Sequence, residues 1–212
     1  MRTDVVNQIR GMLKTFGILI KGIAGVSFEN RIQEIIDEGT AIAPPLQIQL
    51  DMLRMIKQKI DDLDELVLDH AYACQKCRIL MSIPGVGPMT AANFVLAVYD
   101  ADRFTKSKSV GAYFGLTPRR RQSGDMDYNG RISKRGDRVI RHQLYEAANS
   151  ILTRVKKPSS LQAWGLRIAK RSGMKKARIA VARKLAVIMH QMLQTGELFC
   201  FNPATGERAL YA

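Results

Sequence analysis

The sequence is poor in cysteine and has no long apolar run. Its 212 residues include three cysteines, Cys74, Cys77 and Cys200. A membrane-spanning helix needs about 20 consecutive apolar residues, and no run of that length is present. The N-terminus lacks the apolar block of a signal peptide. An odd cysteine count without a secretory signal favours a reduced, cytoplasmic protein with no membrane partner.

Metal ligands in a recognisable spacing are also scarce. Cys74 and Cys77 form a single C-x-x-C with no second pair of ligands nearby. Because a structural zinc ion takes four ligands, we interpret these cysteines as two half-buried thiols on a helix. No cofactor and no metal-binding residue is predicted within this chain.

Acidic residues are nearly missing from one long segment. Met1 to Asp102 contains 10 Lys and Arg against 13 Asp and Glu, whereas Arg103 to Lys184 contains 22 against 4. Such an excess of positive charge in one segment destabilises a folded chain by self-repulsion unless an anion binds it. Nucleic acid is the usual partner, since Lys and Arg contacts to phosphates supply most sequence-independent affinity. Solubility alone, or an RNA-binding surface of the ribosomal type, is the alternative.

The apolar spacing predicts a mainly α-helical bundle in three parts. Residues 1–77 form a helical linker and dimerisation region, 78–196 a basic domain, and 197–212 a short polar tail. Within the first part, gaps of three and four residues predict one long amphipathic helix over 46–67. This helix suits a coiled coil that makes a homo-oligomer, and it suits packing inside its own chain equally well. Its apolar positions are Leu46, Leu50, Leu53, Ile56, Ile60, Leu63 and Val67.

A short Pro-Gly-Val-Gly turn at 84–87 separates two apolar helical patterns and predicts a helix-hairpin-helix. Gly85 and Gly87 permit a tight turn and a close approach of the backbone to a ligand. A helix that begins at Pro88 leaves the amides of its first turn, including that of Thr90, free to bind a DNA phosphate. An ordinary corner between two helices is the structural alternative.

Three consecutive arginines, Arg119, Arg120 and Arg121, precede a glycine-rich polar segment at 123–130 that we predict to be a loop. Ser123 has the surroundings that a nucleophile on phosphate requires, because cations hold the phosphate and offset charge in the transition state. A basic turn without chemistry fits the spacing too. Further candidate DNA-binding residues follow in the next motif, namely Lys134, Arg135 and Arg138. Helices are predicted over 138–154, 161–171 and 175–194.

The segments IPGVGPMTA, GAYFGLTPRRRQSG and GRISKRGDRVIRHQLYEAA, in this order, resemble the C-terminal half of transposases of the IS110 and IS1111 group. That group is related to the pilin-gene invertases. The opening segment TDVVNQIRGMLKTFGI is similar to the helical, coiled-coil middle region of the same proteins. The resemblance therefore runs over nearly the whole chain.

This resemblance implies an enzyme that moves a DNA element by cutting and rejoining strands. Such enzymes combine a RuvC-like N-terminal domain, whose acidic residues hold Mg²⁺, with a C-terminal domain that offers a serine. A guide-like structured RNA pairs the donor and target DNA. Ser123 corresponds to the serine of the family's S-G signature, and Ser133 lies in the neighbouring motif as a structural or phosphate-binding residue.

The sequence departs from the family in two places. Asp125 follows Gly124, where the family continues with glycine and a cation. We expect the acidic N-terminal domain to be missing, because Met1 falls where the family's middle region begins. We therefore expect the serine half of a composite site, inactive alone, in a truncated copy or a fragment. A non-catalytic DNA- or RNA-binding protein, or a regulator of an intact transposase, is the alternative.

Overall fold

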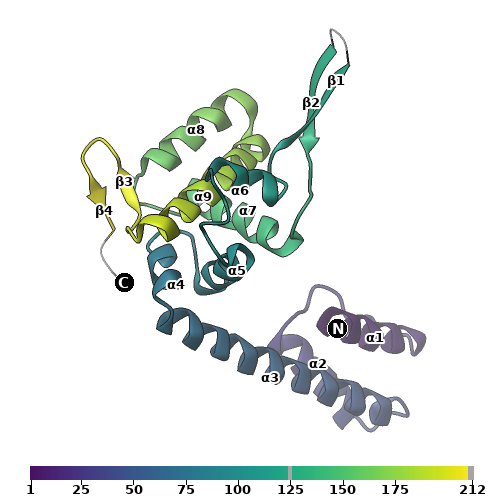
Figure 1. The fold of residues 1–212 in the computed structure, drawn as a ribbon. Coiled ribbons are helices and arrows are strands. Elements are labelled where there is room, and N and C mark those ends of the chain that lie inside the picture. Colours follow the sequence, from purple (N-terminus) through teal and green to yellow (C-terminus); the bar gives the residue numbers. More distant parts are fainter. Residues whose placement is uncertain (124–125, 210–212) are drawn as a thin grey trace. The chain divides into compact units, whose positions relative to one another are not determined.

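The computed structural model describes residues 1–123 and 126–209; of Arg121, Ser123 and residues 126–129 only the backbone is described. The described part is mainly α-helical, as predicted, with two small antiparallel hairpins (Figure 1). Two compact units divide at residue 66, Met1–Leu66 and Val67–Ala212. This division falls earlier than the boundary expected after Cys77. None of the described helices is long and apolar enough to cross a membrane.

The first unit contains α1 (Arg2–Thr15), α2 (Val26–Asp37) and the greater part of α3 (Ala43–Ala73). Each helix turns one apolar face inward. Glu29 of α2 forms ion pairs with Lys57 and Arg54 of α3, which joins the two helices beside the core. The core consists of Val5, Ile9, Leu13, Phe28, Ile32, Ile35, Ile42, Leu46, Leu50 and Leu53.

The second unit is built around α9 (Met174–Thr195), which packs against α4 (Gln75–Met81), α6 (Lys108–Tyr113), α7 (Arg138–Thr153) and α8 (Ser160–Ser172). Helix α5 (Pro88–Val98) completes the body by packing against α4 and α7. Val181, Leu185 and Met189 on α9 are fully buried. The cores of the two units are separate clusters of apolar residues.

Side-chain caps explain why α7 and α8 of the second unit begin where the sequence predicts. Asp137 Oδ1 accepts a hydrogen bond from the amide of Ile140 at 2.9 Å, at the start of α7. Ser159 Oγ accepts one from the amide of Gln162 at 3.1 Å, at the start of α8. Such caps satisfy amides that the helix itself leaves unpaired. The predicted helices over 138–154, 161–171 and 175–194 are confirmed as α7, α8 and α9, of which α9 begins after Gly173 without a side-chain cap.

The prediction of a loop over 123–130 is wrong. β1 (Pro118–Ser123) and β2 (Met126–Ile132) pair antiparallel, with Ser123 opposite Met126. Two residues, Gly124 and Asp125, separate the strands in sequence, a spacing and composition typical of a β-hairpin. The two strands are hard to predict from the sequence because the residues that flank Gly124 and Asp125 are polar and do not alternate with apolar residues.

The C-terminal segment, which we predicted to be a short polar tail, packs aromatic side chains into the core. It holds β3 (Cys200–Asn202) and β4 (Glu207–Arg208), which pair antiparallel. Phe199 and Phe201 are buried in the core of the second unit. The amide of Phe199 donates to Ser82 Oγ at 3.0 Å, which fastens the segment next to α4.

Candidate nucleic-acid interface

The turn between α4 and α5 gives its two glycines different surroundings. Gly85 has φ +89°, and a Cβ there would lie 3.2 Å from both the carbonyl oxygen of Ala147 and the side chain of Ser150. Gly85 is therefore the point where the turn packs on α7. Gly87 has φ −89° and ψ 173°, with open space where its Cβ would stand. Only Gly87 leaves room for a ligand to approach the backbone.

Helix α5 begins directly after Gly87. Pro88 occupies its first turn, and no side chain caps the helix. The first bond along α5 runs from the amide of Ala91 to the carbonyl of Gly87 at 2.9 Å. The amides of Met89 and Thr90 precede it and have no partner within a regular helix, which makes this end of α5 suitable for an anion.

The β1–β2 arm is fixed at its base by two glycines. Gly115 (φ +68°) and Gly136 (φ +79°) both have left-handed backbone conformations that favour glycine. A Cβ on Gly115 would collide with the backbone of Arg135, and one on Gly136 would collide with the carbonyl of Tyr113. The two motifs that flank the arm therefore cross in close backbone contact.

Hydrogen bonds reinforce this crossing. The amide of Lys134 donates to Gly115 O at 3.1 Å, and the amide of Ser133 donates to Thr117 O at 2.8 Å. Arg141 Nη1 donates to the carbonyls of Phe114 at 3.2 Å and of Arg135 at 3.1 Å. Arg141 is thus a structural cation that holds the base of the arm.

The predicted cations around this crossing lie on the surface. Lys134, Arg135 and Arg138 are exposed. Arg119 is also exposed, and its Nη2 donates to Ser133 O at 3.1 Å. We next consider ion pairs of the Lys and Arg residues in 103–184, for the described side chains and with Arg120 left aside. One such pair is present, between Lys157 and Glu207 at 2.9 Å. The positive charge of this segment is therefore largely uncompensated in the described structure.

The candidate residues fall into two groups. Gly85, Gly87 and Thr90 lie at the α4–α5 turn, next to α7. Ser123 is the last residue of β1, and its side chain lies outside the described part of the structure, as does that of Arg121. Figure 1 shows the β1–β2 arm extending away from α5, so the structure does not bring Ser123 to the turn.

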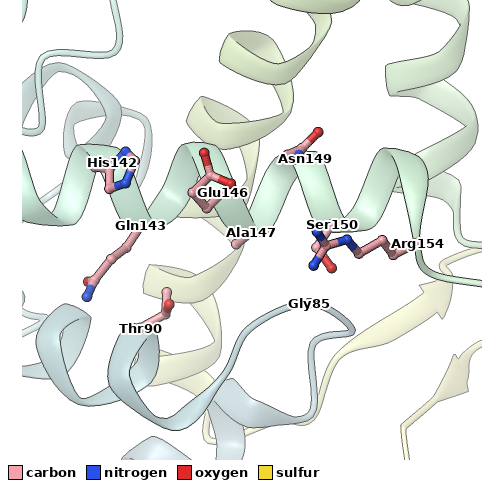
Figure 2. Close-up of a pocket in the computed structure, with 9 residues that line it drawn as sticks. All are labelled: Gly85, Thr90, His142, Gln143, Glu146, Ala147, Asn149, Ser150 and Arg154. Carbon is pink, nitrogen blue, oxygen red and sulfur yellow. The ribbon is translucent and has the colours of Figure 1, made fainter. Parts of the chain in front are cut away.

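A pocket that sequence reasoning missed lies between the α4–α5 turn and α7. Its volume is about 370 Å³. Figure 2 shows Gln143 pointing from α7 toward Thr90 of α5. The sequence signal was a polar stripe beside the apolar face of α7. The lining residues are Gly85, Thr90, His142, Gln143, Glu146, Ala147, Asn149, Ser150 and Arg154.

The cysteine pair adjoins the start of α4. Cys74 is partly buried and Cys77 is buried, and both are free thiols. Burial opposes ionisation of Cys74, but hydrogen bonds from Cys77 and from the Lys76 backbone outweigh it and lower the pKa of Cys74. Burial, together with the hydrogen bond to Cys74, raises the pKa of Cys77 to about 12. No group of three or more His, Cys, Asp or Glu able to hold a metal ion occurs among the described residues.

The chain is similar to transposases of bacterial insertion sequences. Residues 77–164 match the model of the transposase IS116/IS110/IS902 family. The transposase for insertion sequence element IS1111A of Coxiella burnetii is 31% identical over 203 residues, which cover 93% of this chain and 56% of that protein. A probable family 20 transposase of Pseudomonas aeruginosa is 24% identical over 95% of this chain and 61% of its own length.

A pilin gene-inverting protein of Moraxella bovis is 27% identical over 126 residues, covering 58% of this chain and 38% of that protein. The chain spans little more than half the length of the first relatives it matches. The fold is that of a mainly helical protein, and its residues 103–184 are strongly basic. Residues 77–164 match the transposase IS116/IS110/IS902 family and the relatives of nearly the whole chain are insertion-sequence transposases, which agrees with the resemblance that its motifs predict.

Proposed function

We propose that this chain is the DNA-handling part of a transposase and binds nucleic acid through its second unit. The observation that carries the proposal is the excess of positive charge in residues 103–184, which contain 22 Lys and Arg against 4 Asp and Glu. Exposed cations lie at the base of the arm: Lys134 and Arg135 are positioned by backbone contacts with Gly115, and Arg138 is the first residue of α7. Such groups gain most by binding phosphates.

The α4–α5 turn supplies a second contact of a different kind. Gly87 leaves open space beside the backbone, and the amides at the start of α5 have no side-chain cap. Backbone amides at a helix N-terminus bind phosphate without reading the base sequence. The turn and the arm base together therefore favour binding that is strong at low salt and indifferent to sequence.

Ser123 is the proposed nucleophile, on the strength of the family resemblance. The hydroxyl of a serine is weak at neutral pH and needs a base or a metal to activate it. The resemblance assigns that metal, Mg²⁺, to acidic residues of a separate N-terminal domain. The 212-residue chain is then the serine half of a composite site, and a guide-like RNA is its proposed second nucleic-acid partner.

Helix α3 is the proposed contact between copies of the chain. Leu46, Leu50 and Leu53 are buried inside the first unit, which accounts for the beginning of the predicted apolar stripe. The stripe continues to Leu63, which is 61% exposed, and Leu66 beside it is 64% exposed. This uncovered part of an amphipathic helix suits association with a second α3.

The test of nucleic-acid binding is a gel-shift titration at two salt concentrations. If about six phosphates are neutralised, the affinity for a DNA duplex should fall on the order of 1000-fold between about 50 and 200 mM salt. Binding that is absent at low salt, or that ignores salt, would contradict the proposal.

The contribution of the turn is tested by Gly87→Val. The backbone of Gly87 is extended and its Cβ position is open, so valine fits the fold while it obstructs a phosphate. We expect weaker DNA binding with an unchanged circular dichroism spectrum. Gly11→Val is the matched control, because Gly11 also has open space and lies on α1 of the other unit. Equal affinity of a folded Gly87→Val protein would remove the turn from the interface.

A further inference from the structure

The β1–β2 arm is a two-stranded ribbon that the rest of the second unit leaves uncovered. Figure 1 shows it standing away from the helices of that unit. No described helix packs extensively against β1 or β2, which pair with each other. Arg119 and Arg120 are neighbours in β1, so they lie on opposite faces of the ribbon, and both are exposed. Neither face of the ribbon is therefore part of the core there.

The arm is firmly held at its base, although its strands gain little from the core. A two-stranded hairpin in water is marginally stable at best unless a third strand or a helix supports it. At the base, Gly115 and Gly136 cross in close backbone contact, and Arg141 donates to carbonyls on both sides of the crossing. A fixed base and an uncovered ribbon suit a partner outside this chain.

The side chains of the ribbon indicate an anionic partner. Residues 118–132 contain four arginines and two aspartates. Arginine binds phosphate, and arginine and glutamine are also the side chains that pair with guanine and adenine at the edges of bases in the major groove. This combination favours DNA over another anionic surface. The exposed polar residues whose side chains are described are Arg119, Arg120, Gln122 and Arg131.

The dimensions of the ribbon select one groove. Its two strands lie about 4.8 Å apart, and side chains on its two faces bring its thickness to roughly 10 Å. The major groove of B-DNA is about 12 Å wide and admits such a ribbon, whereas the minor groove is about 6 Å wide. The major groove of an RNA duplex is too deep and narrow to be read. β1 has 6 residues, and a strand of this length spans about 20 Å along a groove.

We propose that the β1–β2 arm lies in the major groove of duplex DNA and that Arg120 and Arg131 contact the edges of guanine bases there. The proposal rests on the nucleic-acid binding proposed above and deepens it. The base of the arm and the α4–α5 turn hold the DNA backbone, and the strands of the arm add contacts to the bases. Backbone contacts position a protein on DNA, and base contacts supply sequence preference.

The experiment uses three fluorescent DNA duplexes of about 20 alternating G·C pairs, with binding to the 212-residue chain followed by anisotropy at low salt. One duplex is unmodified. In the second, 7-deazaguanine removes the N7 acceptor from the major groove, which should weaken binding by about fivefold or more. In the third, hypoxanthine removes the guanine amino group from the minor groove, which should change the affinity by less than about twofold.

A double variant assigns the effect to the arm. In Arg120→Ala/Arg131→Ala, the loss of affinity caused by 7-deazaguanine should shrink to less than about twofold. Arg167→Ala/Arg171→Ala is the matched control, because it removes two exposed arginines of the same basic segment from α8. The control should weaken binding to all three duplexes alike and keep the full effect of 7-deazaguanine. Both variants should keep the melting temperature of the parent chain, since all four side chains are exposed.

The failures are distinguishable. Absence of binding to every duplex would overturn the proposed nucleic-acid function together with the role of the arm. Equal affinity for the unmodified and 7-deazaguanine duplexes would overturn the role of the arm alone, as would a loss of affinity confined to the hypoxanthine duplex. Tighter binding of a G·C duplex made of RNA would contradict DNA as the partner. A fall in melting temperature for Arg120→Ala/Arg131→Ala, with the effect of 7-deazaguanine intact, would show that these arginines serve the fold and not DNA.

Discussion

The α-carbon of Gly136 packs against the carbonyl oxygen of Tyr113 so closely that no side chain fits between them. The same crossing brings Gly115 against the backbone of Arg135. Two segments about twenty residues apart are thereby locked together at the base of the β1–β2 arm. Their glycines and the cations around them belong to one structural element, which sets the direction of the strand that ends at Ser123.

Gly136→Ala should destabilise the protein markedly. The new methyl group meets a backbone carbonyl, and alanine is strained at φ +79°. Strain of this kind costs about 1–3 kcal/mol before any displacement of the backbone is counted. We expect the free energy of unfolding, measured by urea denaturation, to fall by more than about 2 kcal/mol.

Gly196→Ala is the control for this experiment. Gly196 has φ +72° at the end of α9 but open space around its Cβ position. Alanine there should cost about 1 kcal/mol, from the conformation alone. If both variants lose the same stability, the close contact with Tyr113 contributes nothing, and the interpretation of the crossing fails.

The cysteine pair should react asymmetrically. The pKa of Cys74 is lowered and that of Cys77 is raised to about 12, so near pH 8 Cys74 holds the larger thiolate fraction. The thiolate is the reactive form. Iodoacetamide at that pH should label Cys74 well before Cys77, as followed by peptide mass spectrometry, and the rate at Cys74 should drop as the pH is lowered through its pKa.

The control is the same labelling in concentrated urea, where the two thiols lose their different surroundings and should react at similar rates. Labelling of native Cys77 as fast as Cys74 would show that the burial of Cys77 does not protect it.

The helices could be predicted because their signals are local. Asp137 and Ser159 cap α7 and α8 by accepting hydrogen bonds from amides three residues further along the chain. The apolar residues of α9 are spaced as in a helix that is buried on several sides. The β1–β2 arm was missed because its strands have no alternation of apolar residues. The pocket could not be predicted, since it forms only when residues 85–90 meet residues 142–154. The same holds for the contact of Gly136 with Tyr113.

Leu63→Glu tests association through α3. Leu63 is largely exposed on the proposed contact face, so a carboxylate there costs the monomer little and would be buried unpaired between two copies. Sedimentation at tens of micromolar should show a dimer for the parent chain and a monomer for this variant. Gln58→Glu, which places the same charge on an exposed residue outside the stripe, should leave the dimer intact. A parent chain that is strictly monomeric would leave α3 with an intramolecular role only.

Ser123→Ala tests the proposed nucleophile. A serine that attacks a phosphodiester becomes joined to one DNA end through its oxygen, and the adduct survives a denaturing gel. We expect no adduct from the 212-residue chain by itself, because activation of the hydroxyl depends on the acidic domain implied by the resemblance. Fusion of the N-terminal half of the Coxiella burnetii IS1111A transposase upstream of the chain should produce the adduct, and Ser123→Ala in this fusion should abolish it.

Ser133→Ala is the matched control in the same fusion. Ser133 stabilises the base of the arm through its backbone, since its amide donates to Thr117 O and its carbonyl accepts from Arg119. Removal of its hydroxyl should therefore leave the adduct unchanged. If the adduct instead persists in Ser123→Ala and disappears in Ser133→Ala, the nucleophile lies at the base of the arm, where Lys134 and Arg135 rather than the three arginines of β1 would hold the phosphate. Strand cleavage by the unaided chain would show that the serine has its activating group within these 212 residues.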